Sequence, residues 1–374
     1  MHKIRVCHIT TVHRPFDVRI FHRMCCALSS HQYEVHLIGR KSNISKSNGV
    51  FLHSIPDFQN RIYRMTAGVS LACLRAVMLR PQIVHLHDPE LLPLGILFRY
   101  LGIVVIYDMH ELLSSQLATK FYLKKFISQY FLREFLKFIE FLAVKHSDAL
   151  VLAEDGYLEP MSKVNPKFQK KFYVIRNFPH VNKIISLKNE AVTNDNGILL
   201  VYIGGLMEIR GIKELILAVS GIENAKLHLI GPWASQKFKQ DCMNLKEYKC
   251  VEYRGVLSHE ETIKIVKTAD IGLSTLYPDK NYLTSLPTKF YEYALCKVPI
   301  LMSNFPYWEK TFNGMAWFTD PKDPAAIRLS ISKIINCSSS RDKVQKAFKK
   351  VSTEWNWENE QGKLLSLYSK LSST

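Results

Sequence analysis

The sequence lacks the short cysteine spacings of a zinc site, because none of its eight cysteines forms a Cys-x-x-Cys pair. The cysteines are scattered through apolar segments, which is typical of reduced core residues in a cytosolic protein. The first residues run directly into a strand pattern without the apolar region of a signal peptide. No run reaches the roughly 18 uninterrupted apolar residues of a membrane span. We therefore expect a cytoplasmic protein that is not integral to a membrane.

Acidic residues are scarce, since 50 Lys and Arg stand against 33 Asp and Glu and leave a formal net charge of +17. Such an excess indicates an anionic partner, and nucleic acid, phosphorylated ligands and anionic lipid headgroups all qualify. Internal repeats and low-complexity tracts are also missing, and the hydrophobic content of 47% is that of a folded protein. The length of 374 residues predicts two domains.

Short apolar runs alternate with longer helical patterns in both halves of the chain. This alternation predicts an α/β fold of two doubly wound parallel-sheet (Rossmann-like) domains, with ligands in a cleft at the carboxyl ends of the strands. We assign residues 1–180 to the first domain, 181–196 to a linker and 197–355 to the second. The expected strands are 4–9, 34–38, 83–86, 103–107, 149–152, 172–175, 198–203, 226–230, 251–253, 271–274, 298–303 and 315–318. The expected helices include 19–28, 63–79, 91–100, 120–144 and 357–371.

Polar side chains follow several strands of the first half. The loop after the first strand lacks Gly-x-Gly-x-x-Gly, which excludes a typical NAD or FAD fingerprint, and Asp17 is placed to cap the next helix. Asp88 and Glu90 follow the third strand, and Glu111 follows the fourth. Such carboxylates permit two interpretations, a metal site or contacts to sugar and acceptor hydroxyls. The loops offer no helical i, i+4 ligand pair, so we favour the second and expect no metal.

In the second half, glycines and a helix start suggest a phosphate site. Gly204 and Gly205 follow the strand 198–203, and Arg210 precedes the next helix. Further on, a polar turn containing Ser285 leads into a helix with Glu292 one turn inside. Unpaired N–H groups at a helix start suit a diphosphate, and a carboxylate beyond them can accept hydrogen bonds from sugar hydroxyls. The alternative is an ordinary loop–helix junction with a solvated Glu.

The segment 120–145 interleaves eight aromatic residues with six basic and two acidic ones. An aromatic, basic helix fits shallow burial in an anionic membrane surface. A core helix whose Lys stems extend to solvent is the alternative. We favour the membrane interpretation.

Taken in order, these motifs resemble the family 4 retaining glycosyltransferases of the two-domain GT-B fold. The resemblance is strongest in the second half, where the matching segments are Tyr202-Ile203-Gly204-Gly205-Leu206, Arg210-Gly211 and residues 286–299. In the first half the acceptor-side loops are similar to His87-Asp88-Pro89-Glu90 and Asp108-Met109-His110-Glu111. The resemblance also implies that the last helix, residues 356–374, packs back onto the first domain.

The resemblance implies roles for individual residues. Glu292 would bind the nucleotide ribose and Arg210 the donor diphosphate, with His110 close to the transferred sugar. Further donor contacts would come from Gly204, Gly205, Lys289 and the backbone of Ser285 and Leu286. Weaker acceptor contacts would come from Asp88, Glu90 and Glu111. No divalent metal would be required, because positive side chains and helix dipoles would stabilise the leaving diphosphate. No cofactor is expected, and a nucleotide diphosphate sugar would be the co-substrate.

Two positions depart from the family pattern. Thr284 stands where the family places a second acid, and Gly205 stands where it places an arginine. Both changes affect contacts to the donor, so the sequence does not identify the donor sugar.

We therefore predict a metal-independent glycosyltransferase (EC 2.4 class) that retains configuration at the anomeric carbon. Its acceptor would be a saccharide or a polyprenyl-diphosphate-linked saccharide, as in capsule, O-antigen or exopolysaccharide synthesis. The protein would lie at the inner face of the cell membrane through residues 120–145. A nucleotide-sugar epimerase of the same fold is the enzyme alternative. A basic nucleic-acid-binding module is the other, although its basic and aromatic residues would be expected on a sheet or groove.

Overall fold

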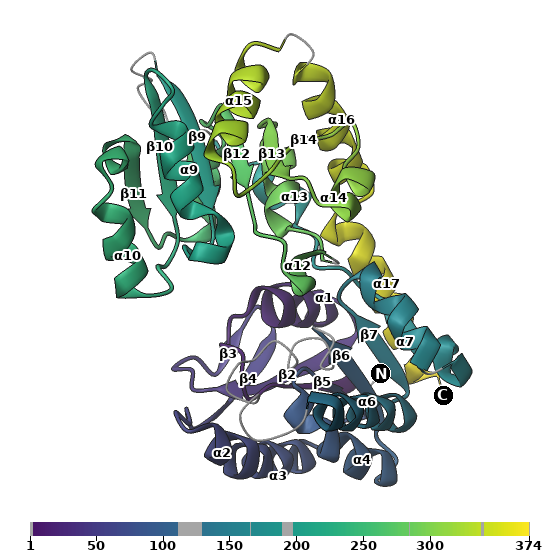
Figure 1. The fold of residues 1–374 in the computed structure, drawn as a ribbon. Coiled ribbons are helices and arrows are strands. Elements are labelled where there is room, and N and C mark those ends of the chain that lie inside the picture. Colours follow the sequence, from purple (N-terminus) through teal and green to yellow (C-terminus); the bar gives the residue numbers. More distant parts are fainter. Residues whose placement is uncertain are drawn as a thin grey trace. The chain divides into compact units, whose positions relative to one another are not determined.

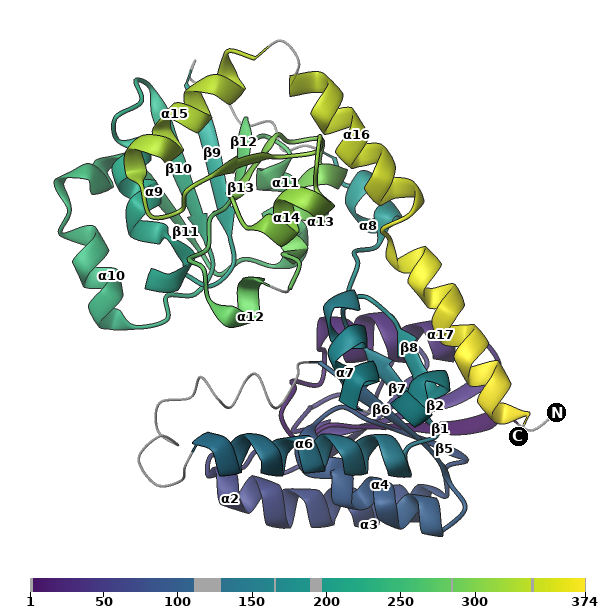
Figure 2. The ribbon, with the colours of Figure 1, turned by 45° about the vertical axis from the view of Figure 1, so that its right-hand side comes forward.

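The computed structural model describes residues 3–110, 129–164, 166–188, 197–283, 285–337 and 340–373. The chain divides into two compact units, one of residues Met1–Asn177 with Asn359–Thr374 and one of Phe178–Glu358. The last helix therefore leaves the second unit and joins the first, as Figures 1 and 2 show by its yellow colour beside purple and blue elements.

The first unit is built on an eight-stranded sheet in the order β3-β4-β2-β1-β5-β6-β7-β8. All neighbouring strands are parallel except β3 and β4. The order reverses between β1 and β5, and such a switch point is where open α/β sheets bind ligands. The strands are β1 Ile4–Ile9, β2 Tyr33–Arg40, β3 Lys46–Ser47, β4 Val50–Ile55, β5 Ile83–Leu86, β6 Val104–Met109, β7 Ala149–Leu152 and β8 Phe172–Val174.

Helices cover both faces of this sheet. One face is covered by α3, α4 and α6, whose inward residues share a core with the strands, and Figures 1 and 2 show these helices together on that side. The helices are α1 Cys26–Ser29, α2 Arg61–Tyr63, α3 Val69–Leu79, α4 Leu92–Tyr100, α6 Gln129–His146, α7 Leu158–Val164 and α17 Trp357–Ser372. Segments with wider, π-type turns, η1 Val18–Cys25 and η2 Arg64–Gly68, precede α1 and α3, and short 3-10 turns form η3 Pro89–Leu91, η6 Asp155–Tyr157 and η7 Pro166–Lys171.

The second unit has a six-stranded parallel sheet in the order β11-β10-β9-β12-β13-β14, which reverses between β9 and β12. Its strands are β9 Ile198–Ile203, β10 Ala225–Ile230, β11 Val251–Gly255, β12 Ile271–Ser274, β13 Ile300–Ser303 and β14 Trp317–Thr319. Its helices are α8 Val181–Ile185, α9 Ile212–Val219, α10 Gln236–Met243, α11 His259–Val266, α12 Lys280–Leu283, α13 Thr288–Leu295, α14 Pro306–Thr311, α15 Pro324–Ile335 and α16 Ser340–Thr353, with 3-10 turns at η8 Glu208–Arg210 and η9 Lys246–Cys250.

The predicted pair of doubly wound parallel sheets is confirmed. The structure differs from the prediction at three places. The antiparallel pair β3 and β4 was not predicted, and the expected helix 19–28 has π-type turns before α1. The segment assigned to a linker begins with α8, whose Ile184 is buried in the core of the second unit.

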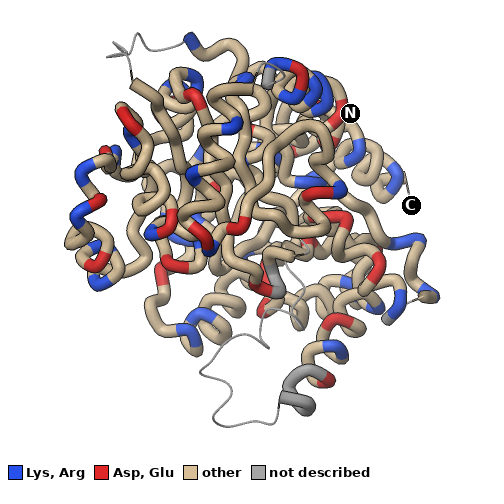
Figure 3. Tube along the Cα trace, turned by 45° about the horizontal axis from the view of Figure 1, so that its top comes forward, with Lys and Arg blue, Asp and Glu red and all other residues tan. Residues whose placement is uncertain are grey.

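Basic residues are not confined to one segment. Figure 3 shows Lys and Arg positions spread along the whole trace, with acidic positions between them. The net charge of +17 therefore does not by itself select one binding surface.

Candidate active site

The second unit brings two glycine turns together at the ends of β9 and β10. Gly204 has φ +114° and Gly231 has φ +138°, a region that L side chains rarely adopt. A Cβ on Gly231 would lie 2.2 Å from the carbonyl oxygen of Gly204, so a side chain at position 231 would push the two turns apart. The close packing leaves Gly204 exposed at the edge of the sheet next to the switch point.

Helix α13 is fixed over the same switch point by its own sequence. Pro287 stands at its start without a side-chain cap, so the first N–H groups have no capping side chain. Tyr293 is buried, and its hydroxyl lies 3.1 Å from the Leu273 carbonyl on β12 and 3.3 Å from that of Val201 on β9. The helix ends where Lys297 adopts φ +58°. These contacts fix the positions of Lys289, one turn before Tyr293, and of Glu292, the residue directly before it.

Lys289 is a buried cation at the end of β9. Its Nζ lies 3.7 Å from the centre of the Tyr202 ring, and its Cε contacts the position that a Cβ of Gly204 would take. Among the described residues this Nζ has no hydrogen-bond partner. Burial, together with the charge of Arg210, lowers the pKa of Lys289 well below its usual value, although Glu292 acts in the opposite direction. A buried ammonium without a partner is costly unless a ligand supplies the missing anion.

Arg210 lies beside Lys289 and Tyr202. It ends the 3-10 turn Glu208–Arg210, and Gly211 with φ +65° leads from it into α9. The Arg210 Nε is also buried without a hydrogen-bond partner within the described part of the chain. Two positive groups with free donors thus converge at one strand end, as an anion site requires.

Glu292 faces a residue that the sequence analysis did not identify. His259 at the start of α11 places its Nε2 2.9 Å from Glu292 Oε1. The Glu292 side chain is 20% exposed, so it is half-buried and accessible from solvent. No local motif pointed to His259, which lies within a capping box, between Ser258 and Glu261, at an ordinary helix start.

The structure places the remaining donor residues near the same helix. The Ser285 carbonyl accepts a hydrogen bond of 2.7 Å from the Trp308 indole, and Leu286 packs on the core of the unit. Thr284, the position that departs from the family pattern, lies outside the described residues.

In the first unit, Asp88 and Glu90 have partners within the protein. Asp88 Oδ2 accepts hydrogen bonds from Thr10 Oγ1 at 2.8 Å and from the Thr11 N–H at 2.6 Å. Glu90 accepts from Arg64 Nε at 2.8 Å. These bonds fix the loop after β1, which is a sufficient structural role for both carboxylates. Their predicted contacts to an acceptor stay a prediction, and Glu111 lies outside the described residues.

Asp17 and Arg19 take definite places beside this loop. Asp17 caps the helical segment that follows, accepting from the Arg19 and Ile20 N–H groups. Arg19 is buried, and its guanidinium binds both carboxylate oxygens of Asp108, at 2.9 and 2.7 Å. Burial alone would raise the pKa of Asp108, but the charge of Arg19 and hydrogen bonds from His110 and His87 hold it well below its usual value.

His110 lies at the accessible end of a histidine cluster. Its side chain is 22% exposed, and its Nε2 lies 3.1 Å from Asp108 Oδ2. The ring of His13, which the sequence analysis did not select, lies 4.9 Å from it. Burial lowers the pKa of His13, but hydrogen bonding to Asp17 and nearby carboxylate charges raise it overall. Only one ring of this pair, that of His110, was expected to contact a ligand.

Two groups in this cluster are close enough to share a metal ion. Donor atoms of His8, His85 and His87 lie within 4.8 Å of one another, as do those of His87, Asp108 and His110. Direct hydrogen bonds favour a different arrangement, because Arg19 takes both oxygens of Asp108 and His8 contacts His87 at 2.9 Å. We therefore treat the cluster as a hydrogen-bonded network.

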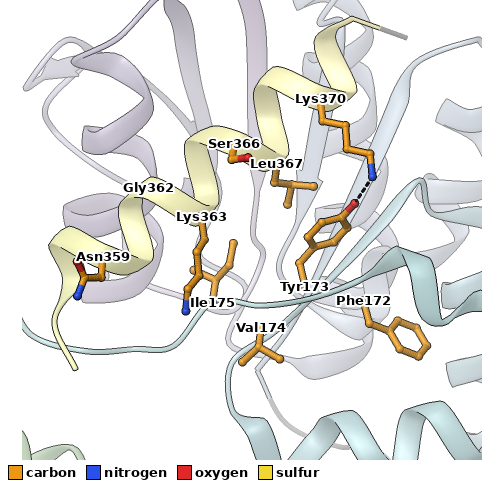
Figure 4. A pocket seen from close by; sticks show the side chains of 10 residues that line it. All are labelled: Phe172, Tyr173, Val174, Ile175, Asn359, Gly362, Lys363, Ser366, Leu367 and Lys370. Carbon is orange, nitrogen blue, oxygen red and sulfur yellow. Dashed lines mark hydrogen bonds between the residues drawn. The ribbon is translucent and has the colours of Figure 1, made fainter. Parts of the chain in front are cut away.

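The first unit also holds a cavity of about 600 Å³ between β8 and α17. Figure 4 shows Lys363 and Lys370 of α17 directed toward β8, with Lys370 Nζ bonded to the Tyr173 hydroxyl at 3.0 Å. Tyr368 on the same helix is buried instead. Helix α17 thus has one side on the cavity and another in the core of the first unit.

Comparison with known proteins gives a family match over part of the chain. The model described as Glycosyl transferases group 1 matches residues 184–351. None of the curated proteins compared with the chain matches it in sequence. The match covers every residue of the second unit's site described above and ends before α17.

Solved structures match over nearly the whole chain. Sucrose-phosphate synthase from Thermosynechococcus elongatus is 15% identical with a TM-score of 0.76, and the match covers 99% of this chain and 100% of that one. A glycosyltransferase from Rickettsia africae is 13% identical, with a TM-score of 0.76 and 99% of both chains covered. Anabaena Alr3699/HepE, solved with UDP-glucose, is 12% identical, with a TM-score of 0.72, covering 98% of this chain and 100% of that one. At these identities the likeness shows a shared GT-B-type fold.

Proposed function

We propose that this chain is a group 1 glycosyltransferase of GT-B-type fold, which transfers a sugar from a nucleotide diphosphate donor to a hydroxyl group with retention of configuration. The Anabaena neighbour was solved with UDP-glucose, which makes a uridine diphosphate sugar the first donor to test.

The observation that carries this proposal is the buried Lys289 Nζ at the end of β9, which has no hydrogen-bond partner among the residues that the structure describes. Arg210 adds a second buried donor nitrogen without a partner among the described residues. A diphosphate at this place would satisfy both cations and also meet the start of α13. Glu292, one turn further along α13, would then accept hydrogen bonds from the ribose hydroxyls.

The proposed reaction breaks the bond between the anomeric carbon and the diphosphate oxygen. The acceptor hydroxyl attacks that carbon from the same face, forms the new glycosidic bond, and its proton leaves with the diphosphate. Lys289 and Arg210 stabilise the negative charge that develops on the leaving group, so no enzymic nucleophile and no metal ion are required. His110 would contact the transferred sugar.

The test combines a panel of nucleotide sugars with and without a lipid-linked saccharide acceptor. We expect release of nucleoside diphosphate that depends on the acceptor, and a product with the donor's anomeric configuration. A sugar altered without any acceptor would instead establish epimerisation. Donor turnover that requires an added divalent cation would contradict the metal-independent reaction.

For the acceptor, we propose a lipid-linked saccharide reached at an anionic membrane surface. Support comes from the outer side of α3, α4 and α6, which cover one sheet face of the first unit. Large apolar side chains are exposed there, including Leu74 at 58%, Met78 at 73%, Tyr100 at 80%, Phe135 at 59% and Phe138 at 54%. Contiguous exposed apolar surface is typical of an interaction site.

The charge on these helices fits anionic headgroups. Neither Arg61–Leu79 nor α4 contains an acidic residue. Basic residues flank the apolar ones at Arg75, Arg80, Arg99, Lys137 and Lys145. Within the described residues, Arg61–Leu79 is also the one helix long and apolar enough to cross a membrane, by length and composition only. Because Val69, Ala72 and Ala76 of this helix pack on the sheet, we propose shallow burial of its outer side. Of the predicted segment 120–145, residues 120–128 lie outside the described structure.

Vesicle co-sedimentation tests this surface. Replacing Leu74 and Met78 by Ser should reduce binding to phosphatidylglycerol vesicles about tenfold at low salt, because about 1.4 kcal/mol of apolar burial is lost. Replacing Val256 and Leu329, which are 68% and 57% exposed in the second unit, is the matched control and should leave binding unchanged. Equal binding by both double variants would refute the membrane surface.

A further inference from the structure

Five side chains from distant parts of the first unit form one hydrogen-bonded chain. It runs from Asp108 on β6 to His87 after β5 at 3.2 Å, and from His87 Nε2 to His8 Nδ1 on β1 at 2.9 Å. From His8 Nε2 it continues to the Tyr368 hydroxyl on α17 at 3.3 Å, and from there to His85 Nδ1 on β5 at 2.7 Å. All five side chains are buried. Buried polar groups of this kind have no water to exchange with, so their protons take fixed places.

The direction of the chain follows from its first member. Asp108 is ionised, because Arg19 binds both of its oxygens, and a carboxylate can only accept. His87 must therefore donate through Nδ1, which leaves its Nε2 as an acceptor. Because His87 Nε2 accepts, His8 must donate to it through Nδ1. The other nitrogen of His8, Nε2, is then an acceptor, and the Tyr368 hydroxyl donates to it.

The last member provides an independent check. Once Tyr368 donates to His8, its oxygen must accept from His85 Nδ1, and His85 Nε2 then carries no proton. This Nε2 is the buried nitrogen that has no partner in the described part of the chain. The opposite direction would leave a buried N–H without an acceptor there, which proteins rarely tolerate. The opposite direction would also place the unprotonated Nδ1 of His87 next to the Asp108 carboxylate, where two acceptors repel each other.

The chain also fixes the proton of His110. Its Nε2 lies 3.1 Å from the same Asp108 oxygen that His87 uses, so His110 donates through Nε2. His110 Nε2 and His87 Nδ1 lie 3.4 Å apart. Both nitrogens donate to Asp108, so this contact is not a hydrogen bond between the two rings. In its neutral form His110 carries no proton on Nδ1, which is free to accept from a hydroxyl.

We propose that Arg19, Asp108, His87, His8 and Tyr368 are positioning residues that hold His110 in its Nε2–H tautomer, with Nδ1 as the hydrogen-bond acceptor for a sugar hydroxyl. The ligand part of this proposal rests on the proposed function, whereas the tautomers do not. Helix α17 thereby contributes to the site through Tyr368.

Nitrogen NMR of ¹⁵N-histidine-labelled protein tests the tautomers without substrate. At a pH where the cluster is neutral, we expect Nδ1–H forms for His8, His85 and His87 and the Nε2–H form for His110. Finding His87 in the Nε2–H form would reverse the chain and overturn the proposal. This outcome is independent of whether the protein proves to be a glycosyltransferase.

Variants then connect the chain to turnover. Asp108→Asn should change the tautomer of His87 or His110 and lower kcat about 100-fold, with the KM for the donor little changed. Tyr368→Phe removes the distal hydroxyl and should lower kcat about fivefold, as the loss of one hydrogen bond predicts. Tyr173→Phe is the matched control, because its hydroxyl bonds Lys370 on the same helix but lies outside the chain. Unchanged tautomers in Asp108→Asn, or equal kcat in the two tyrosine variants, would contradict the proposal. The wild-type spectrum decides it even where a variant fails to fold.

Discussion

Six strands of the first sheet, β4-β2-β1-β5-β6-β7, follow the same order as the six strands of the second. Both units hold buried ionisable groups near the point where this order reverses, yet they treat those groups in opposite ways. In the first unit, Asp108 on β6, the strand next to β5, is bound by Arg19 and linked to the histidines of β1 and β5. At the β9/β12 switch point of the second unit, nitrogens of Lys289 and Arg210 are buried without partners among the described residues. The same fold therefore holds a buried carboxylate that is paired within the protein in one unit, and buried cationic nitrogens without such partners among the described residues in the other.

The difference indicates a structural role for the groups in the first unit and a ligand-binding role for those in the second. A buried carboxylate that is already paired with a guanidinium gains little from an added charge, and its role is to hold neighbouring groups in place. A buried cation without such a partner lowers the stability of the free protein and regains that energy when a ligand of opposite charge binds. Stability measurements should therefore distinguish the two switch points without any assay of activity.

Acid should affect the first unit most, and this is the largest effect that we expect. Burial lowers the pKa of His8 and His85 well below the usual value and that of His87 to about 3. The folded state thus binds fewer protons than the unfolded state below about pH 6.5. The contribution of these histidines to stability is complete above that pH and is lost progressively as the pH falls below it toward each folded pKa.

Tryptophan fluorescence makes this measurement specific to one unit. All five tryptophans belong to the second unit, at positions 233, 308, 317, 355 and 357. Between pH 7 and pH 4, urea unfolding followed by far-ultraviolet circular dichroism should develop an early transition that fluorescence does not report. Coincident transitions at every pH would show that the comparison between the units is wrong.

Lys289→Met should stabilise the free protein, whereas most substitutions of buried residues destabilise it. Loss of the cation should weaken binding of a nucleoside diphosphate about 100-fold in calorimetry, while the free energy of unfolding rises by about 1–3 kcal/mol. The folded pKa of Lys289 lies below the usual 10.5. The free energy of unfolding of the wild-type protein therefore rises with pH between the folded pKa and 10.5. Over that range the difference in unfolding free energy between the variant and the wild type should shrink. Lys297→Met, just beyond the same helix, is the control, since that lysine is exposed. A variant that binds nucleotide normally would remove Lys289 from the site.

Glu292→Gln should have a smaller effect, because it changes the charge of one hydrogen-bonding group and keeps its shape. We expect about tenfold weaker donor binding, as the loss of a charged hydrogen bond predicts. His259→Gln should weaken binding about threefold or less, since His259 acts only through its contact with Glu292. Calorimetry with a nucleoside alone should detect both changes, as the ribose is retained. A larger loss in His259→Gln than in Glu292→Gln would make His259 the ligand contact.

Much of the fold followed from local patterns in the sequence. Most of the predicted strands agree with the structure to within about two residues at each end, because buried parallel strands have continuous apolar runs. β3 and β4 were missed for physical reasons. β3 has two residues, and β4 is interrupted by the polar pair His53-Ser54, so neither shows a strong period.

The sites were predictable only where function follows from local sequence. Gly204, Arg210, Lys289 and Glu292 lie at strand ends or helix starts that the sequence reveals. His259 and Glu292 are 33 positions apart, and Tyr368 and His8 are 360 apart. Contacts over such separations depend on strand order and on the path of α17, which no single segment encodes.

The path of α17 also has a consequence for synthesis of the chain. Tyr368 completes the histidine chain of the first unit, but it is translated only after all of residues 178–358. A nascent first unit therefore emerges from the ribosome with β1, β5 and β6 in place and His8 still lacking its donor. It must remain in that unfinished state while the entire second unit is made, and the final residues then close the first unit's core.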